Sequence, residues 1–224
     1  MQKAHSSKVS LISATLGAGL LLVGTYLHPM NADPNVPPAA FAEYAADSHW
    51  IASHLLQLFG VVFMVAALVL LSRRLEDGAA AEWTSVVRIG AVASLAMAGA
   101  LQAVDGVALK TMVDSWAAAV GSEKPALFHA AFAVRQIEVG LASMSSILFG
   151  LTVSVYGIAL LIDDRFPRWL GTLALVGGVP TVVAGIVIAY TSFSDLAMLI
   201  NMTSSLVLML WIVALGVEVR KRFP

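Results

Sequence analysis

The sequence predicts an all-α, polytopic membrane protein with six transmembrane helices, and three observations support that prediction. Apolar residues make up 59% of the 224 positions and charged residues only 12%, against roughly 25% charged in an ordinary soluble domain. The mean hydropathy is +0.86. The apolar residues gather in stretches of roughly 20 residues, the length that a helix needs to cross a bilayer. Little chain remains for a soluble domain, so we expect one membrane domain over residues 1–224.

The apolar stretches are separated by short polar connections that fix their order. The first stretch follows a polar start but is not followed by an A-x-A cleavage site, which favours an uncleaved helix over a signal peptide. After it, Pro34, Pro37 and Pro38 mark a polar loop, and a short helix is expected from Ala39 to Ala46. The expected spans are residues 9–27, 49–71, 84–107, 141–162, 169–190 and 196–217.

The third and fourth spans are joined by Ala-rich segments that predict helices longer than the bilayer is thick. Between residues 108 and 140 the only strong helix breaker is a turn-like run at residues 121–125, Gly-Ser-Glu-Lys-Pro. We therefore expect a helical hairpin at about 108–140, extended on the outer side of the membrane. Folding back about Glu123 makes Asp105 and Lys110 face the stretch that contains Arg135 and Glu138.

Basic side chains gather on one side of this arrangement. Ten of the 13 Lys and Arg residues fall on the termini and on the loops of the same side, and basic residues are enriched on the cytoplasmic side of membrane proteins. We therefore expect both termini in the cytoplasm. The ten residues are Lys3, Lys8, Arg73, Arg74, Arg88, Arg165, Arg168, Arg220, Lys221 and Arg222.

Composition and motifs exclude several classes of function. The net charge of -1 argues against nucleic-acid binding, which needs a basic face. The chain has no cysteine, which excludes disulfides, thiolate metal sites and cysteine nucleophiles. The sequence contains no glycine-rich phosphate loop, no G-x-S-x-G nucleophile motif and no paired-carboxylate motif of the di-iron type.

Charged and amide side chains near the outer ends of the second, third and fourth spans form a candidate ligand site. Charge beside hydrocarbon is costly unless it is paired, so such a group is a default functional hypothesis. We expect Arg135 to anchor an anion, Glu138 or Asp105 to accept a proton, and His54 to act as a switch or ligand. A neutral network that only fixes helix register is the alternative. The set comprises His54, Gln57, Gln102, Asp105, Lys110, Arg135 and Glu138.

Histidines give a second interpretation, a metal or haem site formed by His49, His54 and His129. Neutral imidazole ligates zinc, copper and haem iron, and two histidines on facing helices can hold a haem between them. The spacing favours this only weakly, because His49 and His54 are five residues apart and lie on different helix faces. No H-E-x-x-H pattern occurs either.

The residues leave three hypotheses open. The first is an outward-facing pocket that binds or transports a small or amphipathic, lipid-like ligand. The second is a membrane enzyme or redox protein with a transition metal or haem. The third is an accessory subunit that docks a partner through the hairpin, or a homo-oligomer. Membrane lipid is a partner under all three.

Several short runs resemble a family of uncharacterised multi-span membrane proteins of bacteria with a domain of unknown function. The resemblance covers most of the chain and implies a multi-pass protein of the bacterial cytoplasmic membrane, and it supplies no activity and no catalytic residue. The runs are His28-Pro29, Asp33-Pro34, Phe41-Ala42-Glu43-Tyr44, Trp50, His54-Leu55-Leu56-Gln57 and Val104-Asp105-Gly106-Val107-Ala108-Leu109-Lys110.

Overall fold

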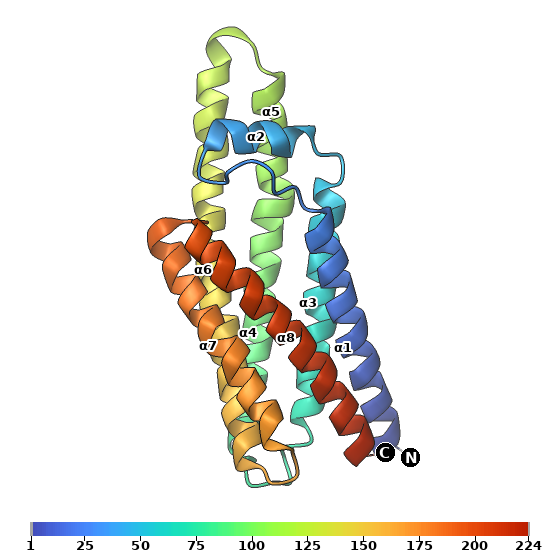
Figure 1. The fold of residues 1–224 in the computed structure, drawn as a ribbon. Coiled ribbons are helices and arrows are strands. Elements are labelled where there is room, and N and C mark those ends of the chain that lie inside the picture. The colour runs from blue at the N-terminus through green and yellow to red at the C-terminus, as the bar shows by residue number, and fades with distance from the viewer. Residues whose placement is uncertain (1, 224) are drawn as a thin grey trace.

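In the computed structural model, the protein is a bundle of long helices from one end of which a helical hairpin projects (Figure 1). The structure describes the backbone of residues 2–223 and the side chains of residues 7–223; the first and last residues of the expected domain and the side chain of Lys3 lie outside this part. Within it the fold is all-α, as predicted. The elements are α1 (Gln2–Leu27), α2 (Pro37–Ala46), α3 (Trp50–Ser72), α4 (Trp83–Gln102), η1 (Ala103–Leu109), α5 (Lys110–Ala118), η2 (Gly121–Glu123), α6 (Lys124–Ile162), α7 (Arg168–Thr191) and α8 (Asp195–Arg222).

The predicted number of helices that could span a membrane is confirmed. Within the described residues, six helical segments are long and apolar enough to cross a membrane. The third and fourth continue well past the expected span limits, which confirms that these two helices are long. The segments are Ser7–Leu27, Trp50–Ser72, Trp83–Ala118, Gly121–Ile162, Arg168–Thr191 and Asp195–Arg222.

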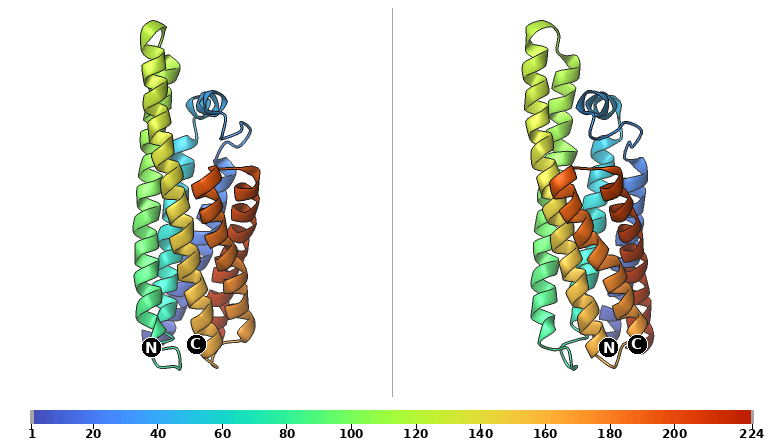
Figure 2. Two further views of the ribbon diagram at one scale, coloured as in Figure 1. Left: turned by 90° about the vertical axis from the view of Figure 1, so that its left-hand side faces the viewer. Right: turned by 60° about the vertical axis from the view of Figure 1, so that its left-hand side comes forward.

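The long third and fourth segments form the projecting hairpin (Figure 2). The chain turns at Gly121, whose φ of +66° lies in the left-handed region that glycine adopts without strain. The register matches a fold-back about Glu123, because Ser94 and Thr152 are equally far from it in sequence and their hydroxyl oxygens lie 3.4 Å apart.

The six long helices form a closed ring. In order around it, α1 packs on α3, α3 on α4, α4 on α6, α6 on α7, α7 on α8, and α8 on α1. Glycines allow the closest approaches: a Cβ on Gly17 would come within 2.8 Å of backbone atoms of α3, and one on Gly150 within 2.7 Å of backbone atoms of α7. Small residues at such contacts are how membrane helices pack without help from the hydrophobic effect.

One end of the ring carries both termini together with the loops at 73–82 and 163–167, and we call it the terminal end (Figure 1). The hairpin tip and α2 lie at the opposite, distal end. The predicted basic loops thus share an end with both termini. Which side of which membrane each end faces stays a prediction.

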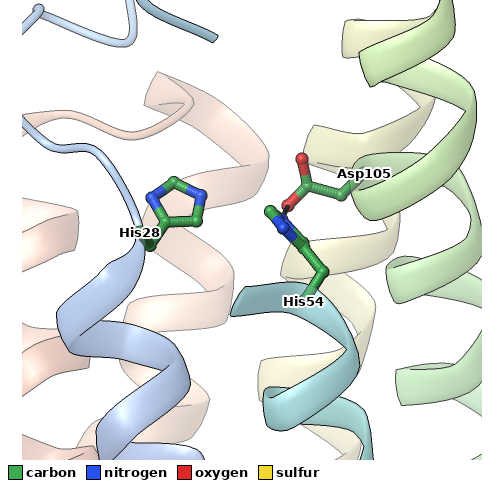
Figure 3. Close-up of side chains that lie close together, drawn as sticks. All are labelled: His28, His54 and Asp105. Carbon is green, nitrogen blue, oxygen red and sulfur yellow. Dashed lines mark ion pairs between the residues drawn. The ribbon is translucent and has the colours of Figure 1, made fainter. Parts of the chain in front are cut away.

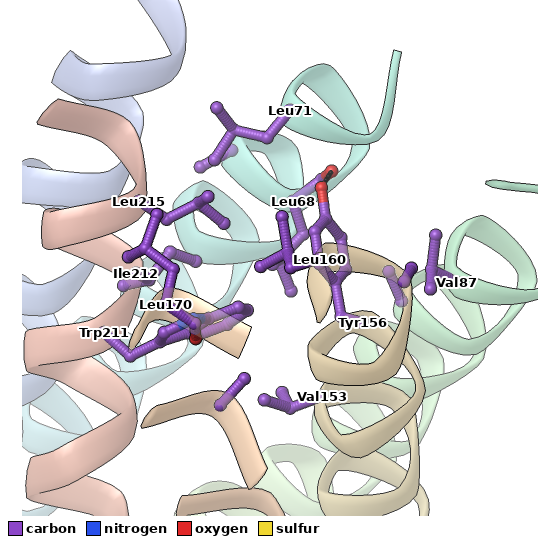
Figure 4. Close-up of a cluster of buried hydrophobic side chains, with 14 of the residues drawn as sticks. Leu68, Leu71, Val87, Val153, Tyr156, Leu160, Leu170, Trp211, Ile212 and Leu215 are labelled. Atoms are coloured by element: carbon purple, nitrogen blue, oxygen red, sulfur yellow. Dashed lines mark hydrogen bonds between the residues drawn. The ribbon is translucent and has the colours of Figure 1, made fainter. Parts of the chain in front are cut away.

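An apolar core fills the ring toward the terminal end, where it includes Leu75, Phe166 and Val219. Figure 4 shows part of this core. Trp211 of α8 and Tyr156 of α6 are each 1% exposed and lie at its centre. Their polar atoms are paired: Trp211 Nε1 donates to the carbonyl oxygen of Leu170 at 3.0 Å, and the Tyr156 hydroxyl donates to that of Leu68 at 3.2 Å. The core therefore leaves no polar group of these large side chains unpaired in the membrane interior.

Candidate functional site

The distal end is covered by the loop at 28–36 and by α2, which lies across the bundle beside the hairpin (Figure 1). Glu43 of α2 ties this loop down, because its carboxylate accepts hydrogen bonds from the backbone and side chain of Asn31 and from the backbone of Ala32, at 2.8–3.0 Å. Burial alone would raise the pKa of Glu43, but these hydrogen bonds outweigh it and lower the pKa. The loop that begins at His28 is thereby held against the bundle.

An aromatic cluster beneath α2 separates the site from water. Phe41 and Trp50 are fully buried, and the ring of Tyr44 packs on that of Trp50 in a tilted arrangement with 4.4 Å between ring centroids. Burial raises the pKa of the Tyr44 hydroxyl to about 12. Trp50 Nε1 donates to the backbone carbonyl of Asp105 at 3.1 Å, which fixes α3 against η1. Polar groups below this cluster are poorly solvated.

His54 is 2% exposed and directs one ring nitrogen at Asp105. Its Nδ1 lies 2.7 Å from the carbonyl oxygen of Trp50. A carbonyl only accepts, so Nδ1 carries the hydrogen and the neutral ring has its lone pair on Nε2. That Nε2 is 3.1 Å from Asp105 Oδ2, yet neither Nε2 nor Asp105 Oδ1 has a hydrogen-bond partner among the described residues. A lone pair facing a carboxylate is repulsive unless a proton or another cation lies between them.

His28 approaches the same point from the end of α1 (Figure 3). Its Nδ1 lies 2.8 Å from the carbonyl oxygen of Pro29, so the same reasoning leaves the lone pair on Nε2. Burial lowers the pKa of His28 and favours the neutral ring. The ligand atoms of His28, His54 and Asp105 all lie within 4.8 Å of one another. Two imidazole lone pairs and a carboxylate therefore converge from three separate elements.

The local backbone makes this convergence possible. A Cβ on Gly106 would lie 2.6 Å from the Cβ of His54, so the close contact of α3 with η1 needs a glycine there. Asp105 and Gly106 belong to η1, a π-helical segment. Such segments are rare in proteins, and those that occur often lie at functional sites.

Arg135 and Glu138 form a buried ion pair next to this group. The Arg135 guanidinium lies 4.7 Å from the centre of the Phe193 ring and 5.8 Å from that of Tyr44, so aromatic faces cover the cation. Asp105 acts electrostatically on both members of the pair. With neutral histidines and with both carboxyls ionised, one cation and two carboxylates would leave the cluster with one net negative charge.

The other residues of the predicted ligand site lie in two places. Gln102 Nε2 donates to Gln57 Oε1 at 3.1 Å, and Gln102 Oε1 has no partner among the described residues. Lys110 does not join the cluster: its ammonium donates to the carbonyl of Ala45 at 3.0 Å and to Asp114 at 2.6 Å, and so closes the end of α2. The structure thus brings together His54 with Asp105, Arg135 with Glu138, and Gln57 with Gln102.

The structure does not bring His49, His54 and His129 together. The His49 side chain is 67% exposed and its nearest acid is Asp47, at 3.8 Å. His129 contacts the ring of Phe128 on the projecting hairpin, with 5.8 Å between centroids. Within residues 7–223, the group that could hold a metal contains His28 instead. A signal for His28 was present in the sequence, since it directly follows the first span and His54 lies in the first two turns of the second.

The comparisons with known proteins leave the chemistry open. A family model for a domain of unknown function, DUF4386, matches residues 11–216. This range contains all the residues of the site and confirms the resemblance to an uncharacterised family. No curated protein and no solved structure matches the chain.

Proposed function

The chain belongs to the DUF4386 family, to which no activity is assigned, and we propose from its site that it is a metal-binding membrane protein. The ion is a divalent transition metal such as Zn²⁺ or Fe²⁺, bound by His28 Nε2, His54 Nε2 and the carboxylate of Asp105. One observation carries the proposal: the ligand atoms of two imidazoles and one carboxylate lie within 4.8 Å of one another, and His54 Nε2 and Asp105 Oδ1 have no hydrogen-bond partner among the described residues.

The donor set and its spacing suit such an ion. Two imidazoles and one carboxylate are characteristic of catalytic zinc and of non-haem iron(II). Donors on a tetrahedral ion with bonds of about 2.0–2.1 Å lie roughly 3.3 Å apart. His54 and Asp105 already have this spacing at 3.1 Å, and His28, whose ligand atom lies within 4.8 Å of theirs, would complete the set by moving closer. The carbonyls of Trp50 and Pro29 hold the two Nδ1–H groups, as second-shell acceptors do in metal sites.

The charge of the cluster favours a metal ion without a porphyrin. When Asp105 and Glu138 are both ionised, a divalent ion would offset the net negative charge that they leave beside Arg135. A haem fits less well, because the rings of His28 and His54 are 5.1 Å apart and both pack on Trp50, which leaves no room for a porphyrin between them.

Three protein ligands leave a coordination position for water or a substrate, the arrangement of catalytic metal sites. A shallow cavity of about 210 Å³ reaches His54 and Gly106 between α3 and η1. Its wall includes Ile51, Leu55 and Val107, each 44–51% exposed on the outside of the bundle, where lipid would lie. A molecule arriving by this path would be amphipathic. The site would then combine the two predicted properties, an amphipathic ligand and a bound metal.

The experiment is metal binding by purified protein. We expect about one Zn²⁺ or Fe²⁺ per chain by elemental analysis, and no haem band in the visible spectrum. After removal of metal with a chelator, titration with Zn²⁺ should show one site that His28→Ala, His54→Ala and Asp105→Asn each weaken at least tenfold. His49→Ala and His129→Ala are matched controls and should bind as the wild type does. Equal affinity in all five variants, or no binding by the wild type, would refute the proposal.

A further inference from the structure

A second feature of the ring is a partly open cavity of about 150 Å³ between the apolar core and the distal end. All six long helices contribute to its wall, from Leu21 of α1 to Ser205 of α8. The cavity is separate from the proposed metal ligands, none of which lines it. Its polar lining residues are Ser94, Ser145, Ser146, Thr181, Asn201 and Ser205, and no charged residue lines it.

The hydrogen bonds of these polar residues are incomplete. Ser94 and Thr181 donate to carbonyl oxygens of their own helices, each at 2.8 Å. The side chains of Ser145, Asn201 and Ser205 make no hydrogen bond within the described residues, although serine in a membrane helix commonly bonds to the carbonyl four residues earlier. Unpaired polar groups in a membrane interior are costly, which favours a polar occupant of this cavity.

Two amide side chains lie between the cavity and the distal end. Gln57 lies one helical turn above Val61 on α3, and Gln102 lies one turn above Ala98 on α4; Val61 and Ala98 both line the cavity. The two amides bond to each other at 3.1 Å, and Gln102 Oε1 is unpartnered among the described residues. In the opposite direction the apolar core closes the ring.

We propose that this cavity is a hydrated vestibule, entered from the distal end past Gln57 and Gln102, that takes small uncharged polar molecules, water first. At roughly 30 Å³ per water molecule, the volume of about 150 Å³ holds about five. The uncharged lining disfavours ions, because an ion would lose its hydration shell there without a compensating charge.

The absence of cysteine from the chain allows a direct test with single-cysteine variants. Ser145→Cys and Ser205→Cys place a thiol in the cavity with little change of shape. Methyl methanethiosulfonate, a small neutral reagent, reacts with the thiolate, which forms only where water is present. The controls are Ala174→Cys, at a fully buried core position, and Val176→Cys, at a position on α7 that is 54% exposed.

We expect labelling of both cavity variants, followed by mass spectrometry in lipid nanodiscs, at least tenfold faster than labelling of both controls. Labelling no faster than Ala174→Cys would mean that the cavity is dry and would overturn the proposal. The entry path has its own test: Gln57→Leu with Gln102→Leu should slow the labelling of Ser145→Cys severalfold. An unchanged rate in a variant that keeps its melting temperature would overturn entry from the distal end.

Discussion

Arg135 and Glu138 lie one turn apart on α6 and form an ion pair that the distal end buries almost completely, with side-chain exposures of 7% and 3%. Taking two charges out of water is expensive, and a buried pair repays that cost only while both partners are present. The surface pair of Lys221 and Glu218 provides a contrast, because the Lys221 side chain is 67% exposed. The two pairs should therefore respond very differently to the loss of the basic partner.

Removing Arg135 alone should be strongly destabilising. We expect Arg135→Ala to lower the free energy of unfolding by about 3–5 kcal/mol, because it leaves Glu138 buried and unpaired. The double variant with Glu138→Ala should lose much less than the two single variants added together. Lys221→Ala should cost less than about 1 kcal/mol. Unfolding followed in detergent gives all four values, and additive single effects would show that the pair is not coupled.

Gly106 should be required for the contact of His54 with η1. A Cβ at this position would lie 2.6 Å from the His54 Cβ, and we expect Gly106→Ala to cost about 1–3 kcal/mol by overpacking and to weaken Zn²⁺ binding. Gly99, in the adjoining helix α4, has nothing within 4 Å of an added Cβ, so Gly99→Ala should be neutral or stabilise by up to about 1 kcal/mol. Melting curves and metal titrations of the two variants provide the comparison, and equal behaviour would contradict it.

The features that hydropathy and charge encode locally were predictable from the sequence. Six apolar stretches and a single strong breaker near Gly121 were enough to predict the spans and the long hairpin. Charge at span ends pointed to His54, Asp105, Arg135 and Glu138, which the structure places in two close pairs.

The features that the sequence did not predict depend on contacts between residues far apart in the chain. His28 reaches the site because Glu43 accepts hydrogen bonds from Asn31 and Ala32, 11–12 residues earlier in the chain, and so holds the loop that begins at His28. A periodic sequence pattern does not indicate such a contact. Lys110 was expected at the right level but points to α2. The fold-back about Glu123 fixes only the level of a residue along the hairpin, and the direction of the Lys110 ammonium follows from its acceptors, the carbonyl of Ala45 and the carboxylate of Asp114.

Close packing of α1 on α3 should depend on Gly17. An added Cβ there would lie 2.7 Å from the backbone nitrogen of Met64 and 2.8 Å from the carbonyl oxygen of Gly60, atoms that cannot move without shifting α3. We expect Gly17→Ala to destabilise the protein by about 1–3 kcal/mol. Gly19 on the same helix has open space at its Cβ, and Gly19→Ala should be neutral or slightly stabilising. The melting temperatures of the two variants test this prediction. An unchanged melting temperature for Gly17→Ala would contradict the close packing of α1 on α3.

Asp163 should give the terminal end an acid-sensitive anchor. It follows α6, is 2% exposed, and accepts hydrogen bonds from Arg165 Nε at 2.9 Å and from an Arg165 terminal nitrogen at 2.7 Å. That terminal nitrogen also donates to the carbonyl of Arg74 at 2.7 Å, which joins two loops. The hydrogen bonds from the Arg165 side chain hold the pKa of Asp163 below its ordinary value of 3.8.

Because the pKa of Asp163 is lowered in the folded protein, its contribution to stability is lost in acid. The unfolded chain binds the proton more readily, so the contribution of Asp163 to stability is complete above about pH 5 and is lost as the pH falls through the lowered pKa of the folded state. We expect Asp163→Asn to cost about 1–3 kcal/mol at pH 7 and to flatten the decline in stability below pH 4. Asp164→Asn, at the exposed neighbouring position, should leave the curve unchanged. Melting temperatures from pH 7 to pH 3 test this, and parallel curves for wild type and Asp163→Asn would show that the Asp163 carboxylate does not carry the acid sensitivity.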